Sequence, residues 1–211
     1  MKRLVLALAL ALCAPLLAAA ETSGDLFVKG EAAAGEKLAG TCAACHGPAG
    51  VSGNPEWPSL AQQNARYTFE QLKAFKEGTR KNPLMSAQAA GLTEQNMRDL
   101  AAYFAEQTAK PGVASEESVA IAEPLYRAGD LERGILGCAG CHAPNGVGNP
   151  AAGYPKVAGQ HATYTAKRLR AYRSGEGIET AHGKIMAAVA EKLTDEEIDA
   201  LASYLNGLQI R

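Results

Sequence analysis

Aromatic residues are scarce in this chain of 211 residues, where they make up only 6% of the sequence. Hydrophobic residues reach an ordinary 47%, so we expect a core in which another apolar group replaces some aromatic side chains. Neither sign of charge dominates, because 21 lysines and arginines face 22 aspartates and glutamates. This balance argues against a nucleic-acid partner and indicates no particular protein partner.

A long apolar run occurs only at the start of the chain. Lys2 and Arg3 precede an apolar stretch over residues 4–17, and three alanines follow at 18–20. A spanning helix needs about 20 apolar residues, which is more than this run supplies. The pattern predicts a signal peptide over residues 1–20 that is cleaved on export, and hence a periplasmic protein.

Cysteine is also rare, with 5 in the whole chain, and Cys13 belongs to the predicted signal. The other four form two CxxC pairs, each followed directly by histidine: Cys42, Cys45 and His46, then Cys138, Cys141 and His142. Disulfides, a redox dithiol or a zinc site are the alternatives for such pairs. A dithiol does not require the histidine, and two cysteines with one histidine leave a zinc site short of a ligand. CxxCH is the attachment signature of c-type haem, so we predict two covalent haem c groups with their iron.

The chain is a tandem repeat. The two CxxCH motifs align with each other, and so do Pro58 with Pro155 and Met85 with Met186. The polar segment between the repeats carries a Pro-Gly pair, which indicates a linker. We therefore predict a first domain over residues 21–112, a linker over 113–119 and a second domain over 120–211.

The periodicity of apolar residues predicts an all-α fold, with no segment that demands a sheet. Residues 65–77 and 162–173 read as helices, each followed by a glycine stop at Gly78 and Gly175. Thr93 and Thr194 are expected N-caps of a last helix in each repeat. A short helix is expected before each CxxCH.

The haem ligands follow from the repeat. The cysteines would form thioethers with the haem vinyl groups, and His46 and His142 would bind the iron on one side. Met85 and Met186 are the methionines that align, so we predict them as the distal ligands. Met97 aligns with Ile198 on an apolar stripe and is expected in the core. His161 and His182 have no histidine counterparts and are expected at the surface.

Histidine and methionine together fill both axial positions of the iron. Such a site has no place for oxygen, peroxide or substrate, so we predict outer-sphere electron transfer and no catalytic residue. The ligand pair also raises the haem reduction potential. A di-haem peroxidase would need one haem without a methionine, which the matching pair disfavours.

These motifs, with the segments 85–104 and 159–165, resemble the cytochrome c4 family over essentially the whole mature chain. The resemblance implies two class I cytochrome c domains. It also implies that Pro58 and Pro155 give their carbonyls to the proximal histidines. Tyr67, Tyr164, Gln63 and Gln160 would lie near the haem propionates. Gln62 departs from the pattern, because the second repeat has Gly159 there.

The resemblance further implies a role as electron carrier from a quinol-oxidising complex to a terminal oxidase, with loose membrane attachment in some members. The alternative is a di-haem electron-transfer subunit of a periplasmic dehydrogenase. One basic cluster, at Lys167, Arg168, Arg170 and Arg173, reads as a solvated helix face, with docking of an acidic partner as the other interpretation.

Overall fold

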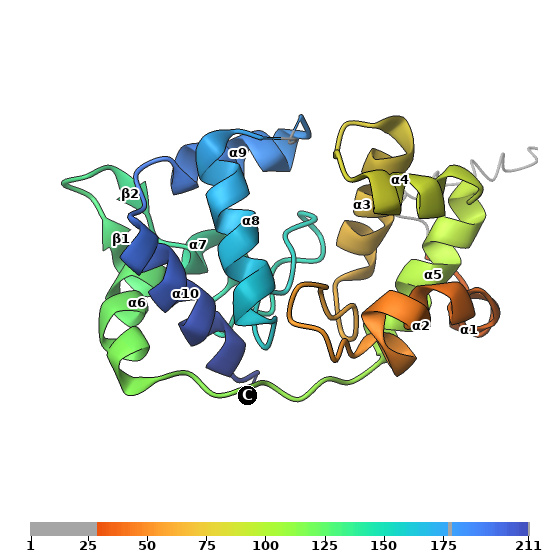
Figure 1. The fold of residues 1–211 in the computed structure, drawn as a ribbon, viewed down its shortest axis with the longest axis horizontal. Coiled ribbons are helices and arrows are strands. Elements are labelled where there is room, and N and C mark those ends of the chain that lie inside the picture. The colour runs from red at the N-terminus through yellow and green to blue at the C-terminus, as the bar shows by residue number, and fades with distance from the viewer. Residues whose placement is uncertain (1–28, 177–178, 211) are drawn as a thin grey trace, which may run out of the picture.

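The computed structural model describes residues 29–176 and 179–210, so the predicted signal peptide lies outside the described residues. The chain forms two helical domains side by side, joined by an extended linker along one edge (Figure 1). The elements of the first domain are α1 (Ala32–Leu38), α2 (Gly40–His46), the 3₁₀ turn η1 (Pro48–Gly50), α3 (Ala65–Glu77), α4 (Pro83–Ala90) and α5 (Glu94–Glu106). Those of the second domain are α6 (Glu116–Ala128), β1 (Gly129–Asp130), β2 (Ile135–Leu136), α7 (Ala139–His142), α8 (Ala162–Ser174), α9 (Ala181–Ala190) and α10 (Asp195–Gly207).

The last helix of each domain begins at a capping box. The Thr93 hydroxyl accepts from the backbone of Asn96, whose side chain accepts in return from Thr93 N–H. Thr194 and Glu197 make the same reciprocal pair at α10. Two orphan donors are satisfied at each helix start. Both predicted N-caps are confirmed.

The first helix of each domain packs across the last. In the first domain Gly35 of α1 lies so close to α5 that an added Cβ would stand 2.0 Å from the Asp99 carbonyl oxygen. In the second domain the buried Ala122 and Tyr126 of α6 pack against α10. Gly35 and Ala122 are small enough to let the two helices approach, which brings the start and end of each repeat together. α6 begins at Glu116, inside the segment predicted as a linker.

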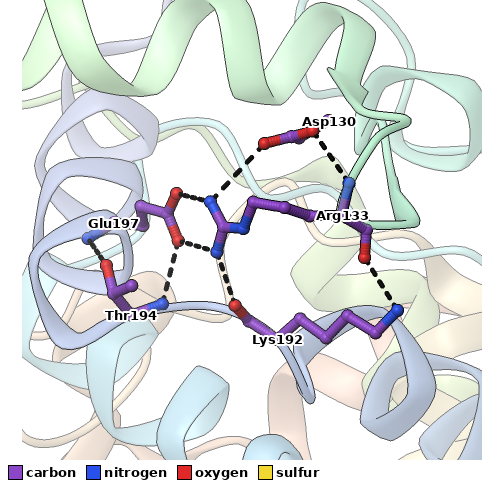
Figure 2. A network of polar contacts seen from close by, with 5 residues as sticks. All are labelled: Asp130, Arg133, Lys192, Thr194 and Glu197. Atoms are coloured by element: carbon purple, nitrogen blue, oxygen red, sulfur yellow. Dashed lines mark hydrogen bonds and ion pairs between the residues drawn. The ribbon is translucent and has the colours of Figure 1, made fainter.

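A short β-hairpin distinguishes the second domain. β1 and β2 pair antiparallel between α6 and the second CxxCH, whereas α1 is followed almost directly by α2. Arg133 in the hairpin turn forms two hydrogen bonds with Glu197 of α10, and it also donates to the Lys192 carbonyl (Figure 2). Lys192 donates back to the Arg133 carbonyl. The network ties the hairpin to the start of α10.

The two domains contact each other through the same pair of side-chain hydrogen bonds, made in both directions. The Gln63 amide donates to the Lys156 carbonyl at 2.9 Å and accepts from Lys156 N–H at 2.8 Å. Gln160, its repeat mate, does the same with the carbonyl and N–H of Ser59, both at 2.9 Å. Asn64 adds hydrogen bonds to the carbonyls of Val147 and Tyr154. Backbone groups that no helix satisfies are thus paired across the interface.

Candidate haem sites

Each CxxCH motif lies at a helix that places its histidine inward. His46 ends α2 and is only 7% exposed, and its Nδ1 lies 2.8 Å from the Pro58 carbonyl oxygen. A carbonyl oxygen can only accept, so Nδ1 carries the proton and Nε2 keeps its lone pair. Burial lowers the pKa of His46, which favours the neutral ring. The neutral imidazole with one free nitrogen is the form that binds iron.

The second motif repeats this geometry. His142 ends α7, is 7% exposed, and places Nδ1 at 3.0 Å from the Pro155 carbonyl oxygen. Burial lowers its pKa as well. Pro58 and Pro155 therefore stand where the resemblance places them, as partners that orient the ring.

None of the four motif cysteines forms a disulfide in the described part of the chain. Cys42 and Cys138 are partly buried, and Cys45 and Cys141 are exposed. Burial raises the pKa of Cys42 and raises that of Cys138 to about 11. A redox dithiol works through a thiol with a lowered pKa, so these two do not match that alternative. Two cysteines that no disulfide joins, next to an imidazole whose Nδ1 is engaged with a carbonyl, are the donor set that a covalently attached haem requires.

The aligned methionines occupy equivalent elements. Met85 lies in α4, which packs on α3, and Met186 lies in α9, which packs on α8; both are partly buried. Asn82 caps α4 by accepting from Met85 N–H. Met97 is 1% exposed within α5, so its predicted place in the core is confirmed. Met85 and Met186 therefore lie in equivalent helices, each of which directly precedes the last helix of its domain.

His161 and His182, expected at the surface, are half-buried and contact the other domain. His161 is partly buried and donates through Nε2 to the Ser52 carbonyl of the other domain at 2.8 Å. His182 lies 3.8 Å from Glu70 of the first domain and packs on the Tyr154 ring. Both face the domain interface. The sequence of a single repeat cannot show this, because the partner residues belong to the other domain.

Sequence reasoning also missed what Gln63 and Gln160 do. The resemblance implies that both lie near the haem propionates, which stays a prediction. The structure shows in addition that both amides bond to backbone of the opposite domain. Their alignment in the repeat was the available signal. A glutamine that occurs at the same position in both repeats can bind the opposite domain as well as a cofactor.

Comparison with known proteins agrees with this geometry. The family model described as cytochrome c matches twice, at residues 32–108 and 134–209. Cytochrome c4 of Pseudomonas aeruginosa is 42% identical over 186 residues, covering 88% of this chain and 92% of that protein. The chain belongs to the cytochrome c4 family. Cytochrome c4 of Azotobacter vinelandii is 41% identical over 195 residues, with 88% and 93% covered.

A solved structure extends the likeness to the whole fold. Reduced recombinant cytochrome c4 from Pseudomonas stutzeri superposes with a TM-score of 0.82 at 42% identity, covering 85% of this chain and 100% of that one. Membership of the cytochrome c4 family shows that the chain is an all-α, di-haem electron-transfer cytochrome with two covalent haem c groups, one at each CxxCH. Its members are electron carriers and not enzymes.

Proposed function

We propose that this protein carries single electrons in the periplasm, from a quinol-oxidising complex to a terminal oxidase. His46 and Met85 would hold the iron of the first haem, and His142 and Met186 would hold that of the second. When bound, the haem supplies a one-electron couple. The chain holds each imidazole in one tautomer. With a methionine as the second ligand, each iron would have no open position, and electron transfer would need no bond making there.

The observation that carries this proposal is the repeated contact between a histidine Nδ1 and a proline carbonyl, at 2.8 Å and 3.0 Å. It orients two imidazoles alike, and each repeat has a methionine in the matching element. A catalytic haem would need one of these sites to differ. The two sites instead share the same set of residue types.

A redox titration of the purified protein tests the carrier role. We expect two one-electron steps, full reversibility, and no binding of carbon monoxide to the reduced protein, because both axial positions are filled. Stopped-flow mixing with a quinol-oxidising complex should reduce both haems within the turnover time of that complex. Binding of carbon monoxide to one haem would contradict a closed carrier.

Export to the periplasm and loose attachment to the membrane can each be tested by cell fractionation. Nowhere in the described residues does a helix have both the length and the apolar character that a membrane crossing requires. Cell fractionation should release the protein with the periplasmic contents, and a salt wash should release any fraction that sediments with membranes. A fraction that resists salt and needs detergent would show an anchor and contradict loose attachment.

The second candidate is a di-haem subunit that serves a dehydrogenase. A protein of Thiomonas intermedia named thiosulfate dehydrogenase electron acceptor is 34% identical over 194 residues, with 89% of this chain and 88% of that protein covered. Tagged protein isolated from its own cells distinguishes the two roles. A catalytic subunit at fixed stoichiometry supports the second candidate, and isolation of the cytochrome alone supports the free carrier.

A further inference from the structure

In the first domain, one peptide group lies between the proximal histidine and a glutamine of the other domain. This is the peptide that joins Pro58 to Ser59. Its carbonyl oxygen lies 2.8 Å from His46 Nδ1, and its N–H donates to Gln160 Oε1 at 2.9 Å. The imidazole, the peptide and the glutamine amide therefore form one continuous chain of hydrogen bonds that crosses the domain interface.

The second domain has the same chain with the roles of the domains exchanged. The peptide that joins Pro155 to Lys156 has its carbonyl oxygen 3.0 Å from His142 Nδ1, and its N–H donates to Gln63 Oε1 at 2.8 Å. Each member of this chain is the repeat mate of a member of the first. The duplication thus connects each proximal histidine to a side chain of the opposite domain.

Both glutamines are fixed by the start of a helix. Gln63 directly precedes Asn64, the N-cap residue of α3, and its Oε1 also accepts from Asn64 N–H at 2.9 Å. Gln160 precedes His161, the N-cap residue of α8, and its Oε1 accepts from His161 N–H at 3.0 Å. Each amide nitrogen donates to the carbonyl of the same residue whose N–H the oxygen binds across the interface. These hydrogen bonds hold each amide in one orientation.

Hydrogen bonds in such a chain strengthen one another. A peptide whose N–H donates to an oxygen is polarised, and its carbonyl becomes a better acceptor, a cooperative effect of about 10–30% per bond. A better acceptor for the Nδ1–H of a histidine makes the other ring nitrogen a more basic metal ligand. A more basic ligand stabilises ferric over ferrous haem, so the reduction potential falls.

We propose that Gln160 tunes the reduction potential of the first haem and Gln63 that of the second, each across the domain interface. Both are positioning residues, because each acts on the iron through a peptide group and a proximal histidine. Docking of the two domains therefore lowers both potentials. The inference rests on the proposed ligation of iron by His46 and His142, and it does not depend on the donor or the acceptor.

Gln160→Ala and Gln63→Ala in the haem-loaded full-length protein test this. Heteronuclear NMR of the reduced protein, labelled at histidine nitrogen, reports each Nδ1–H, and a redox titration followed by NMR assigns each potential to its haem. In Gln160→Ala we expect the His46 Nδ1–H resonance to move upfield. The first haem should become easier to reduce, by up to about ten-fold in the redox equilibrium, about 59 mV for one electron. The second haem should not change, and Gln63→Ala should give the mirror image.

A second variant reverses the sign of the effect. Gln160→Glu keeps an acceptor oxygen for Ser59 N–H and makes the bond charge-assisted, so the His46 Nδ1–H should move downfield and the first potential should fall. His161→Ala and Asn64→Ala are the matched controls. They remove cross-domain hydrogen bonds to carbonyls that no proximal histidine binds, and both Nδ1–H resonances should stay in place.

The pattern across the domains decides the outcome. Nδ1–H resonances that stay unchanged in both alanine variants, or potentials that shift equally at both haems, would show that the glutamines only join the domains. A shift confined to the haem of the glutamine's own domain would also overturn the proposal. Failure of the ligation itself would appear in the wild type, where the protons of His46 and His142 would lack a large paramagnetic shift on oxidation.

Discussion

Gln63 and Gln160 hold each domain to the other by the same pair of hydrogen bonds, made in opposite directions. Across the interface, each amide accepts from the backbone N–H and donates to the carbonyl of the same residue, Lys156 or Ser59. The residues are repeat mates, so the interface reflects the internal duplication of the chain. The same loops carry Pro58 and Pro155, whose carbonyls orient the proximal histidines.

Replacing either glutamine by alanine should loosen the interface. Gln63→Ala leaves Lys156 N–H and C=O without partners, a cost of about 1–3 kcal/mol. Limited proteolysis of the segment between Gln107 and Ser115 should be faster in Gln63→Ala and in Gln160→Ala. Gln107→Ala is the control, since its amide donates to the Tyr103 carbonyl of its own domain. Equal cleavage rates in all variants would contradict the role of the glutamines.

Gln62 and Gly159 give a second test, because both adopt the left-handed conformation, with φ of 64° and 70°. That conformation costs a non-glycine residue about 1–2 kcal/mol. Gly159→Ala should therefore destabilise the second domain by about 1 kcal/mol, and Gln62→Gly should not destabilise the first. Chemical denaturation measures both. Gly91→Ala, at φ of −84° in open space, is the control and should be neutral or slightly stabilising.

Met186→Ala should open the second haem while leaving the first unchanged. Loss of the sulfur ligand lowers the reduction potential of that haem and lets it bind carbon monoxide when reduced. The sulfur-to-iron charge-transfer band should fall to about half its intensity, because only one of the two haems would keep its methionine ligand. Met97→Leu is the control, because Met97 is buried in α5. Unaltered titration of both haems would show that Met186 is not a ligand.

The pair of Arg133 and Glu197 predicts a stability that depends on pH. Hydrogen bonding to Arg133 lowers the pKa of Glu197 below its ordinary 4.5. A carboxyl with a lowered folded-state pKa stabilises the protein above the unfolded pKa, and this contribution is lost as pH falls through the folded value. Because Arg133 is 38% exposed, we expect Glu197→Gln to cost only about 0.5–1 kcal/mol at neutral pH.

Denaturant unfolding of the wild type and Glu197→Gln across pH 7 to about 3 checks this prediction. The difference between the two proteins should shrink as pH falls below 4.5 and should be constant above about pH 6. A difference that persists unchanged in acid would mean that the pair acts through packing and not through charge. The partner variant Arg133→Gln should show the same pH dependence.

Local chemistry was enough to predict much of this protein. CxxCH needs adjacent residues only, so the haem sites could be read directly, and the duplication showed which methionine matched which. The helices predicted over residues 65–77 and 162–173, the glycine stops that follow them and the N-caps Thr93 and Thr194 all follow from short-range patterns. The structure confirms them, with the second helix one residue longer.

The tertiary structure decided what depends on residues far apart in the chain. His161 and His182 look like surface histidines within one repeat, yet they meet Ser52 and Glu70 of the other domain. Arg168 belongs to the basic cluster read as a solvated helix face, yet its guanidinium lies over the Tyr172 ring and its Nε is buried. Gln62 shows the same limit, because its left-handed backbone is imposed by the turn that binds Phe104. Sequence periodicity reports the face that a residue presents within its own helix, but the partner across an interface is set by packing between separate domains.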